Sequence, residues 1–184
     1  MSWIPIAVAA GVTLLVALWV ALTYNRLRAL QYACDDAWSL VDVQLQRRAD
    51  LVPNLVTVVQ AYAAHERAVL EAVTEARARA AALHDPSPAT AAAEARLGSS
   101  INSALALQET YPDLKASEQF LQLQRTIADA EDQIAASREI YNGNVAAYRN
   151  LIQQVPSNWV AGQFGFADRS MFAAPNLQDF RHPA

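Results

Sequence analysis

Cysteine and glycine are scarce in this chain of 184 residues, which contains one cysteine and five glycines. A single cysteine, Cys34, excludes both a disulfide framework and a metal site built from several thiolates. So few glycines disfavour a turn-rich β protein. Basic charge is scarce too, because the formal net charge is -4 at pH 7, so no positive field attracts nucleic acid. The composition therefore favours a helical protein that does not bind nucleic acid.

Sequence motifs for catalysis and cofactor binding are also missing. The sequence contains no GxSxG nucleophile elbow, no phosphate-binding glycine loop and no dinucleotide fingerprint. His65 and Glu66 begin like the HExxH zinc motif, but Val69 stands where the second histidine ligand would be. Asp35 and Asp36 are adjacent, and adjacent residues of a helix point in different directions. We therefore expect no catalytic residue, no metal site and no cofactor.

A long apolar run near the N-terminus is the clearest positive feature. Residues 3–23 contain no charged side chain. About 20 apolar residues in a helix cross the hydrocarbon core of a bilayer, which is about 30 Å thick. Trp3 lies at one end of the run, and Trp19 and Tyr24 lie near the other, as expected of aromatic residues at the two membrane interfaces. We expect residues 1–25 to form an uncleaved, single-pass membrane anchor.

A cleaved signal peptide is the alternative to this anchor. It would need a basic start, a shorter apolar core and a small-residue cleavage site, and the run has none of these. The sequence says less about the side of the membrane on which the main domain lies than about the presence of the anchor. Arg26, Arg28, Arg47 and Arg48 follow the run, so the positive-inside tendency leans toward a cytoplasmic main domain. The lean is small, because Arg47 and Arg48 lie far along the chain.

Apolar residues recur at steps of three and four through most of the remaining chain, which is the period of an α-helix. The pattern is broken by "HDPSP" at 84–88, "YPDLKAS" at 111–117 and "VPSN" at 155–158. Long helices with short connections form antiparallel bundles. The sequence therefore predicts an all-α fold, in which a transmembrane helix continues into an elongated antiparallel bundle of long, coiled-coil-like helices over residues 26–156.

The segment "RRADLVPN" raises a local question about this pattern. Asp50 stands three residues before Pro53, so it could cap a new helix whose first turn contains the proline. Arg47 and Arg48 would then close the preceding helix, where the helix dipole favours cations. We expect a helix corner formed by Asp50, Pro53 and Asn54. The alternative is an exposed patch in which Arg47 and Arg48 bind an acidic partner or lipid headgroups.

The C-terminal segment, residues 157–184, lacks helical periodicity but is too rich in aromatic residues to be a simple disordered tail. It either packs on the bundle as a strap or contacts a partner, a second copy or the membrane surface, because exposed aromatic clusters mark contact sites. The candidate contact residues are Trp159, Phe164, Phe166 and Phe172.

Four stretches carry a resemblance to a known family. They are "YNRLRALQYACDDAWSLVDVQLQRRADLVPNLVTVVQAYAAHERAVLEAVTEAR", "YPDLKASEQFLQLQ", "REIYNGNVAAYRNLIQQVP" and "GFADRSMF". Together they resemble the LemA family of bacterial membrane-anchored proteins. The chain departs from the family at Gln31, Cys34 and Gln46, which weakens any claim that positive charge there is essential. The resemblance implies a helical bundle on one helix in the bacterial inner membrane and no established enzyme activity. It also implies a TPM-domain protein or a membrane metallopeptidase as a candidate partner.

These observations predict a non-enzymatic, membrane-anchored scaffold or adaptor that organises partners or self-assembles at the bacterial membrane. Ala7 and Gly11 offer a small-residue face through which the anchor could form a homo-oligomer. The alternative is a regulatory ligand-binding or signalling protein with a pocket between the helices, near Tyr141, Asn144 and Tyr148.

Overall fold

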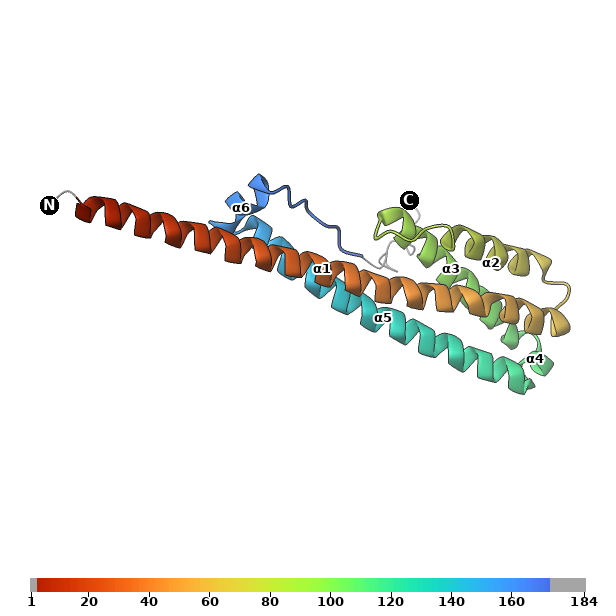
Figure 1. Ribbon diagram of the computed structural model, residues 1–184. Helices are drawn as coiled ribbons and strands as arrows, with labels where there is room; N and C mark the ends of the chain where they lie inside the picture. Colours follow the sequence, from red (N-terminus) through yellow and green to blue (C-terminus); the bar gives the residue numbers. More distant parts are fainter. Residues whose placement is uncertain (1–2, 173–184) are drawn as a thin grey trace. The chain divides into compact units, whose positions relative to one another are not determined.

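The structure, a computed structural model, describes residues 3–172, and these residues form six α-helices and one short 3-10 helix (Figure 1). The elements are α1 (Trp3–Tyr62), α2 (Arg67–Ala80), α3 (Pro88–Ala106), η1 (Leu107–Glu109), α4 (Pro112–Ala116), α5 (Glu118–Gln153) and α6 (Ser157–Gln163). No strand occurs in the described part of the chain. The predicted all-α class, with a long apolar N-terminal helix followed by further helices, is confirmed.

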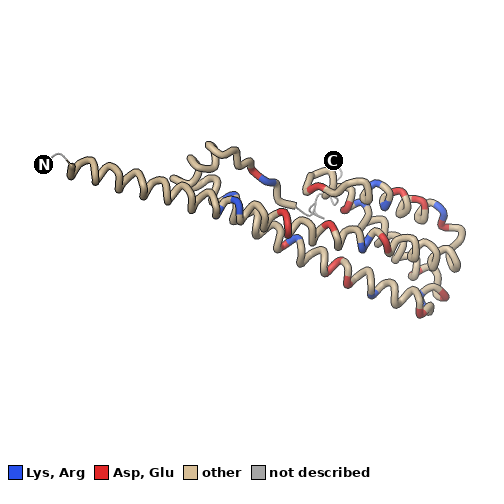
Figure 2. The backbone as a smooth tube through the Cα atoms, viewed as in Figure 1, with Lys and Arg blue, Asp and Glu red and all other residues tan. Residues whose placement is uncertain are grey.

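The first part of α1 is surrounded by no other part of the described protein. Every residue from Trp3 to Leu18 is exposed, and Figure 2 shows no charged residue along this part of the helix. Within residues 3–172, α1 is the one helix that is long and apolar enough to cross a membrane. Both observations are consistent with a membrane protein.

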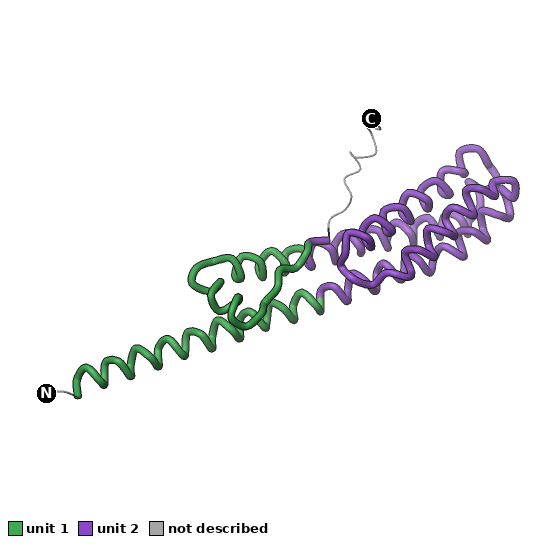
Figure 3. Tube along the Cα trace, turned by 90° about the horizontal axis from the view of Figure 1, so that it is seen from above, with its two compact units in different colours: residues 1–36, 142–170 green, residues 37–141, 171–184 purple. Residues whose placement is uncertain are grey.

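The chain divides into two compact units (Figure 3). Unit 1 comprises residues 1–36 and 142–170, and unit 2 comprises residues 37–141 and 171–184. Because α1 and α5 are long, each contributes residues to both units. Helices α2, α3 and α4 belong to unit 2, and α6 belongs to unit 1.

The predicted helix corner at Asp50, Pro53 and Asn54 is wrong, because α1 runs through Pro53 without interruption. A proline inside a helix has no N–H to donate to the carbonyl four residues earlier, which here is that of Ala49. That carbonyl instead accepts a hydrogen bond of 2.8 Å from Nε of Arg77 in α2. The helix can therefore continue, because a side chain of the neighbouring helix replaces the missing backbone donor.

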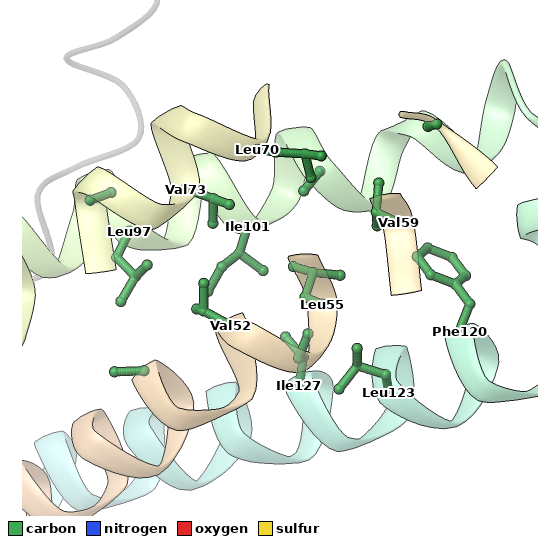
Figure 4. Close-up of a cluster of buried hydrophobic side chains, with 14 of the residues drawn as sticks. Val52, Leu55, Val59, Leu70, Val73, Leu97, Ile101, Phe120, Leu123 and Ile127 are labelled. Carbon is green, nitrogen blue, oxygen red and sulfur yellow. The ribbon is translucent and has the colours of Figure 1, made fainter. Parts of the chain in front are cut away.

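The apolar core of unit 2 lies between α1, α2, α3 and α5 (Figure 4). Each helix buries residues spaced by three or four, so one face of each is directed inward. The core residues labelled in the close-up are Val52, Leu55, Val59, Leu70, Val73, Leu97, Ile101, Phe120, Leu123 and Ile127. The buried face of α1 continues from Leu45 past Pro53 to Val59.

In unit 1 the end of α5 packs beside α1. Leu27 and Cys34 of α1 are fully buried, and Nδ2 of Asn144 donates a 2.9 Å hydrogen bond to the carbonyl of Ala33. Tyr148 is also fully buried, and its hydroxyl donates to the carbonyl of Ala167 at 2.9 Å. The chain that follows α6 therefore folds back onto the two helices of unit 1.

Two ion pairs hold this returning segment in place. Nη1 of Arg169 lies 2.6 Å from Oδ1 of Asp35 on α1, and Nε of Arg149 on α5 lies 3.0 Å from Oδ1 of Asp168. Residues 168 and 169 of the predicted C-terminal segment are thus paired with α5 and α1 of unit 1. Residues 173–184 of that segment, and residues 1–2 of the predicted anchor, lie outside the described residues.

Candidate functional site

A buried arginine joins three helices of unit 2. Arg48 lies on α1 and is 5% exposed. Its Nη2 forms an ion pair with the carboxylate of Glu94 on α3 and donates to the Glu94 carbonyl at 3.0 Å. Its Nη1 lies 2.6 Å from Oε1 of Glu131 on α5. One guanidinium therefore connects α1, α3 and α5 through charge-assisted hydrogen bonds, which are the stronger kind.

The two carboxylates of this cluster have different surroundings. The side chain of Glu94 is 9% exposed, and that of Glu131 is 43% exposed. Burial raises the pKa of Glu94 above its ordinary value, and Arg48 opposes this shift while Glu131 adds to it. The ionised form of Glu94 therefore depends on Arg48, whereas water can solvate Glu131.

A groove of about 1030 Å³ opens beside the cluster. Its wall is formed by residues of α1, α2, α3 and α5, together with Phe172, all in unit 2. The polar residues that line it include Arg48, Glu94, Ser99, Ser103, Glu131 and Arg138. This volume lies at the upper end of what small-molecule sites have, about 300–1,000 Å³.

Arg138 on α5 is a half-buried cation of the groove. Within residues 3–172 it forms no ion pair, and its Nε is buried without a hydrogen-bond partner. Its guanidinium carbon lies 5.5 Å from the centroid of the Phe172 ring, so the contact is of the cation–π type. Burial lowers the pKa of Arg138, and the nearby Arg48 lowers it further. An anionic group in the groove would relieve this repulsion.

The family model for the LemA family matches residues 37–184, which is well over half of the chain. The chain belongs to the LemA family. The match begins where unit 2 begins and contains Arg48, Glu94, Glu131 and Arg138.

Three similar proteins illustrate the range of relatives of this LemA-family chain. Protein LemA of Metamycoplasma hominis is 26% identical over 155 residues, which cover 84% of this chain and 70% of that protein. Magnetosome protein MamQ of Magnetospirillum gryphiswaldense is 23% identical over 150 residues, 68% of this chain and 55% of that protein. Magnetosome protein MamQ 2 of Paramagnetospirillum magneticum is 23% identical over 156 residues, 71% of this chain and 57% of that protein. The chain thus spans little more than half of the two MamQ proteins, and none of the three names denotes an enzyme.

The structure does not place Arg47 and Arg48 of this LemA-family chain in one exposed patch. Arg47 is exposed, whereas Arg48 is buried in its ion pairs, so the predicted contact patch is wrong for Arg48. A signal for this was present in the sequence, because Arg48 stands three residues after Leu45 on the buried face of the helix. A new helix that starts near Pro53 would instead place Arg48 at the exposed end of the preceding helix.

The aromatic residues of the C-terminal segment divide into two groups. Phe172 is buried in unit 2, where its ring lies 5.0 Å from the ring of Trp38. Trp159 is 62% exposed and Phe164 is 51% exposed, both in unit 1. Phe166 is half-buried in unit 1. Phe172 is therefore a packing residue in this LemA-family chain, and Trp159 and Phe164 remain candidates for contact with something outside it.

The three aromatic residues proposed for the membrane interfaces lie on α1. Trp3 is 70% exposed, Trp19 is half-buried, and the ring of Tyr24 lies edge-on to those of Phe164 and Phe166. Tyr24 is thus brought together with Phe164 and Phe166 of the predicted C-terminal contact set.

Proposed function

We propose that this chain is a non-enzymatic scaffold or adaptor of the bacterial inner membrane, held by a single-pass anchor at residues 3–23. The observation that carries the proposal is the exposure of large apolar side chains around the first part of α1. Leu14 is 71% exposed and Ile6 is 69% exposed. A patch of this kind is unfavourable in water and matches the hydrocarbon of a bilayer.

In this proposal the anchor concentrates the two folded units at the membrane, where their surfaces organise partners. The groove of unit 2 is the surface that we propose for recruitment. The relatives named for a magnetosome support a role in organising a cellular structure rather than in catalysis. A TPM-domain protein, a membrane metallopeptidase and a second copy of this chain stay proposals for the partner.

We propose a cytoplasmic location for both units. Arg26 and Arg28 follow the apolar run directly and are exposed, so they satisfy the positive-inside tendency. Arg47 and Arg48 add nothing to this argument, because they lie on the part of α1 that belongs to unit 2. Protection of both units from protease added outside intact spheroplasts supports this side, and cleavage contradicts it.

Deletion of residues 2–18 tests the anchor. We expect the full chain to sediment with membranes after a carbonate wash and the shortened chain to stay soluble. The melting temperature of the folded units should change little, because residues 3–18 are exposed and pack on no other described residue. A control in which the same segment is replaced by leucine and alanine of equal length should still sediment. Release of the full chain by carbonate contradicts the proposal.

The mass of the full chain and of the variant that lacks residues 2–18, both measured in mild detergent, distinguishes a self-assembling scaffold from an adaptor. A discrete oligomer that becomes a monomer on deletion of residues 2–18 supports self-assembly through the anchor. Monomers in both cases support an adaptor that binds a different protein.

A second candidate function is the binding of a small anionic ligand, and the position of Arg138 in the groove favours it. If a carboxylate or phosphate ligand supplies the missing partner of Arg138, native mass spectrometry of the purified chain should show an added small-molecule mass. Arg138→Gln should lose that mass, whereas Arg125→Gln, at an exposed position of the same helix, should keep it. The absence of added mass in the unaltered chain contradicts this second function.

A further inference from the structure

The part of α1 that no other residue covers is short for a membrane span. From Trp3 to Leu18 the helix is exposed all round, and at 1.5 Å per residue this part is about 24 Å long. The hydrocarbon core of a bilayer is about 30 Å thick. The next turn of the apolar run, at Trp19, Val20 and Thr23, is partly or fully covered by protein. A helix that crosses the whole hydrocarbon core therefore includes this covered turn, and the residues that cover it lie at the membrane interface.

The covering protein is the returning chain of unit 1. The Tyr24 ring lies 5.0 Å from the Phe164 ring and 5.6 Å from the Phe166 ring, both edge-on. The Arg28 guanidinium lies 5.3 Å from the Phe166 ring centroid. Figure 1 shows α6 beside α1 at the end of α5. The residues that follow α6 thus lie against α1 at the point where its apolar run ends.

This returning chain carries no charge for a long stretch. Residues 150–167 contain no Lys, Arg, Asp or Glu, as Figure 2 shows around α6, and the flanking residues Arg149 and Asp168 form an ion pair. Val155 is 82% exposed, and Trp159 of α6 is 62% exposed. Exposed apolar side chains without charges fit poorly in water, and tryptophan is enriched at membrane interfaces.

We propose that residues 150–167, which run from the end of α5 through α6, form a second membrane contact that inserts Trp159 and Val155 between lipid headgroups. This inference rests on the proposed anchor, because the anchor sets the height of the bilayer on α1. A single transmembrane helix leaves the tilt of unit 1 against the membrane plane unrestrained. A contact beside the helix restrains that tilt and keeps α6 at the membrane interface.

Nitroxide labels on the full chain in phosphatidylcholine–phosphatidylglycerol vesicles test the contact. In a Cys34→Ala background, single cysteines are placed by Trp159→Cys, by Leu14→Cys in the anchor and by Tyr32→Cys, which is 64% exposed on α1 of unit 1. The measurement compares accessibility to oxygen, which partitions into lipid, with accessibility to a water-soluble nickel chelate. We expect the ratio at Trp159 to be several-fold higher than at Tyr32 and below that at Leu14.

The arms of this experiment separate the two proposals. If Leu14 reports lipid while Trp159 matches Tyr32, the second contact is wrong and the anchor stands. If Leu14 itself matches Tyr32, the anchor is wrong and the second contact falls with it. Spin–spin broadening at Trp159 that disappears on dilution with unlabelled chain assigns the surface to a second copy and also overturns the inference. If Trp159→Cys lowers the melting temperature, Gln163→Cys, at an exposed position of the same helix, replaces it under the same criteria.

Discussion

Replacing Arg48 with methionine is expected to lower the free energy of unfolding by about 3–5 kcal/mol, the usual cost of removing one partner of a buried ion pair. The change leaves the buried carboxylate of Glu94 without its cation and removes the contact of α1 with Glu131. Arg47→Met is the matched control, because Arg47 is the next residue of the same helix and is exposed. It should change stability by less than about 0.5 kcal/mol.

Removal of both charges tests the reason for this loss. A buried ion pair replaced by apolar residues of similar volume often costs little, because the desolvation of both charges is relieved. The double variant R48M/E94M should therefore recover most of the stability that Arg48→Met loses. Urea unfolding of the four proteins, including Glu94→Met, measures the coupling. Equal losses in Arg47→Met and Arg48→Met would contradict a buried role for Arg48.

The loss in Arg48→Met should also depend on pH. Burial raises the pKa of Glu94, so the folded protein holds the Glu94 proton more tightly than the unfolded chain does. The contribution of Glu94 to stability is then complete below its pKa in the unfolded chain, about 4.3, and is lost as the pH rises through its pKa in the folded protein. Without Arg48 the folded pKa rises further. The difference between Arg48→Met and the unaltered chain should therefore be smallest near pH 4 and grow toward neutral pH.

Local signals in the sequence predicted the start of α3 but not the break between Tyr62 and Arg67, which divides one run of apolar periodicity into α1 and α2. Ser87 has the residue type of an N-cap and Pro88 that of a first helical residue, and α3 begins at Pro88 with the Ser87 hydroxyl accepting from the N–H of Thr90 at 3.2 Å. A break does occur at 111–117, but Pro112 begins the short helix α4, whereas the pattern indicated that Pro112 ends a helix. Caps and first-turn prolines act within a few residues, so their effect can be predicted without knowledge of the fold.

Periodicity predicted which face of α5 is buried, up to the point where the helix ends. Phe120, Ile127, Tyr141 and Tyr148 stand at steps of three and four along this part of the sequence, and all four are buried. Val155 continues the same spacing but is 82% exposed, because α5 ends at Gln153 and the chain turns into α6. A periodic pattern carries no information beyond the helix that it describes.

The partners of Arg48 could not be predicted from the sequence. Glu94 is 46 residues away and Glu131 is 83 residues away, and nothing near either marks it as the acceptor. The groove depends on the same long-range arrangement. Arg48 was expected to close a helix or to bind a partner at the surface, and its burial against Glu94 shows that packing between helices overrides that expectation.

Pro53→Ala is expected to stabilise the fold by about 1–3 kcal/mol, because proline in a helix interior is about 3 kcal/mol less favourable than alanine. The gain is smaller than the full difference because Arg77 already supplies a donor to the carbonyl of Ala49. Arg77→Met alone should cost about 1–3 kcal/mol, since it leaves that acceptor unsatisfied at a buried residue. Arg79→Met is the matched control on the exposed side of α2 and should cost less than about 0.5 kcal/mol.

The two changes should not be additive. In P53A/R77M the alanine N–H at position 53 can donate to the Ala49 carbonyl, so the loss of Arg77 should cost about 1 kcal/mol less than it does beside the proline. Chemical unfolding of the single and double variants measures this difference. Additive losses would mean that Arg77 acts elsewhere, for example on Asp50, whose Oδ1 lies 3.7 Å from its Nη2. Coupling would show that the continuity of α1 is supplied by another helix, and therefore that no interpretation of α1 alone could have predicted it.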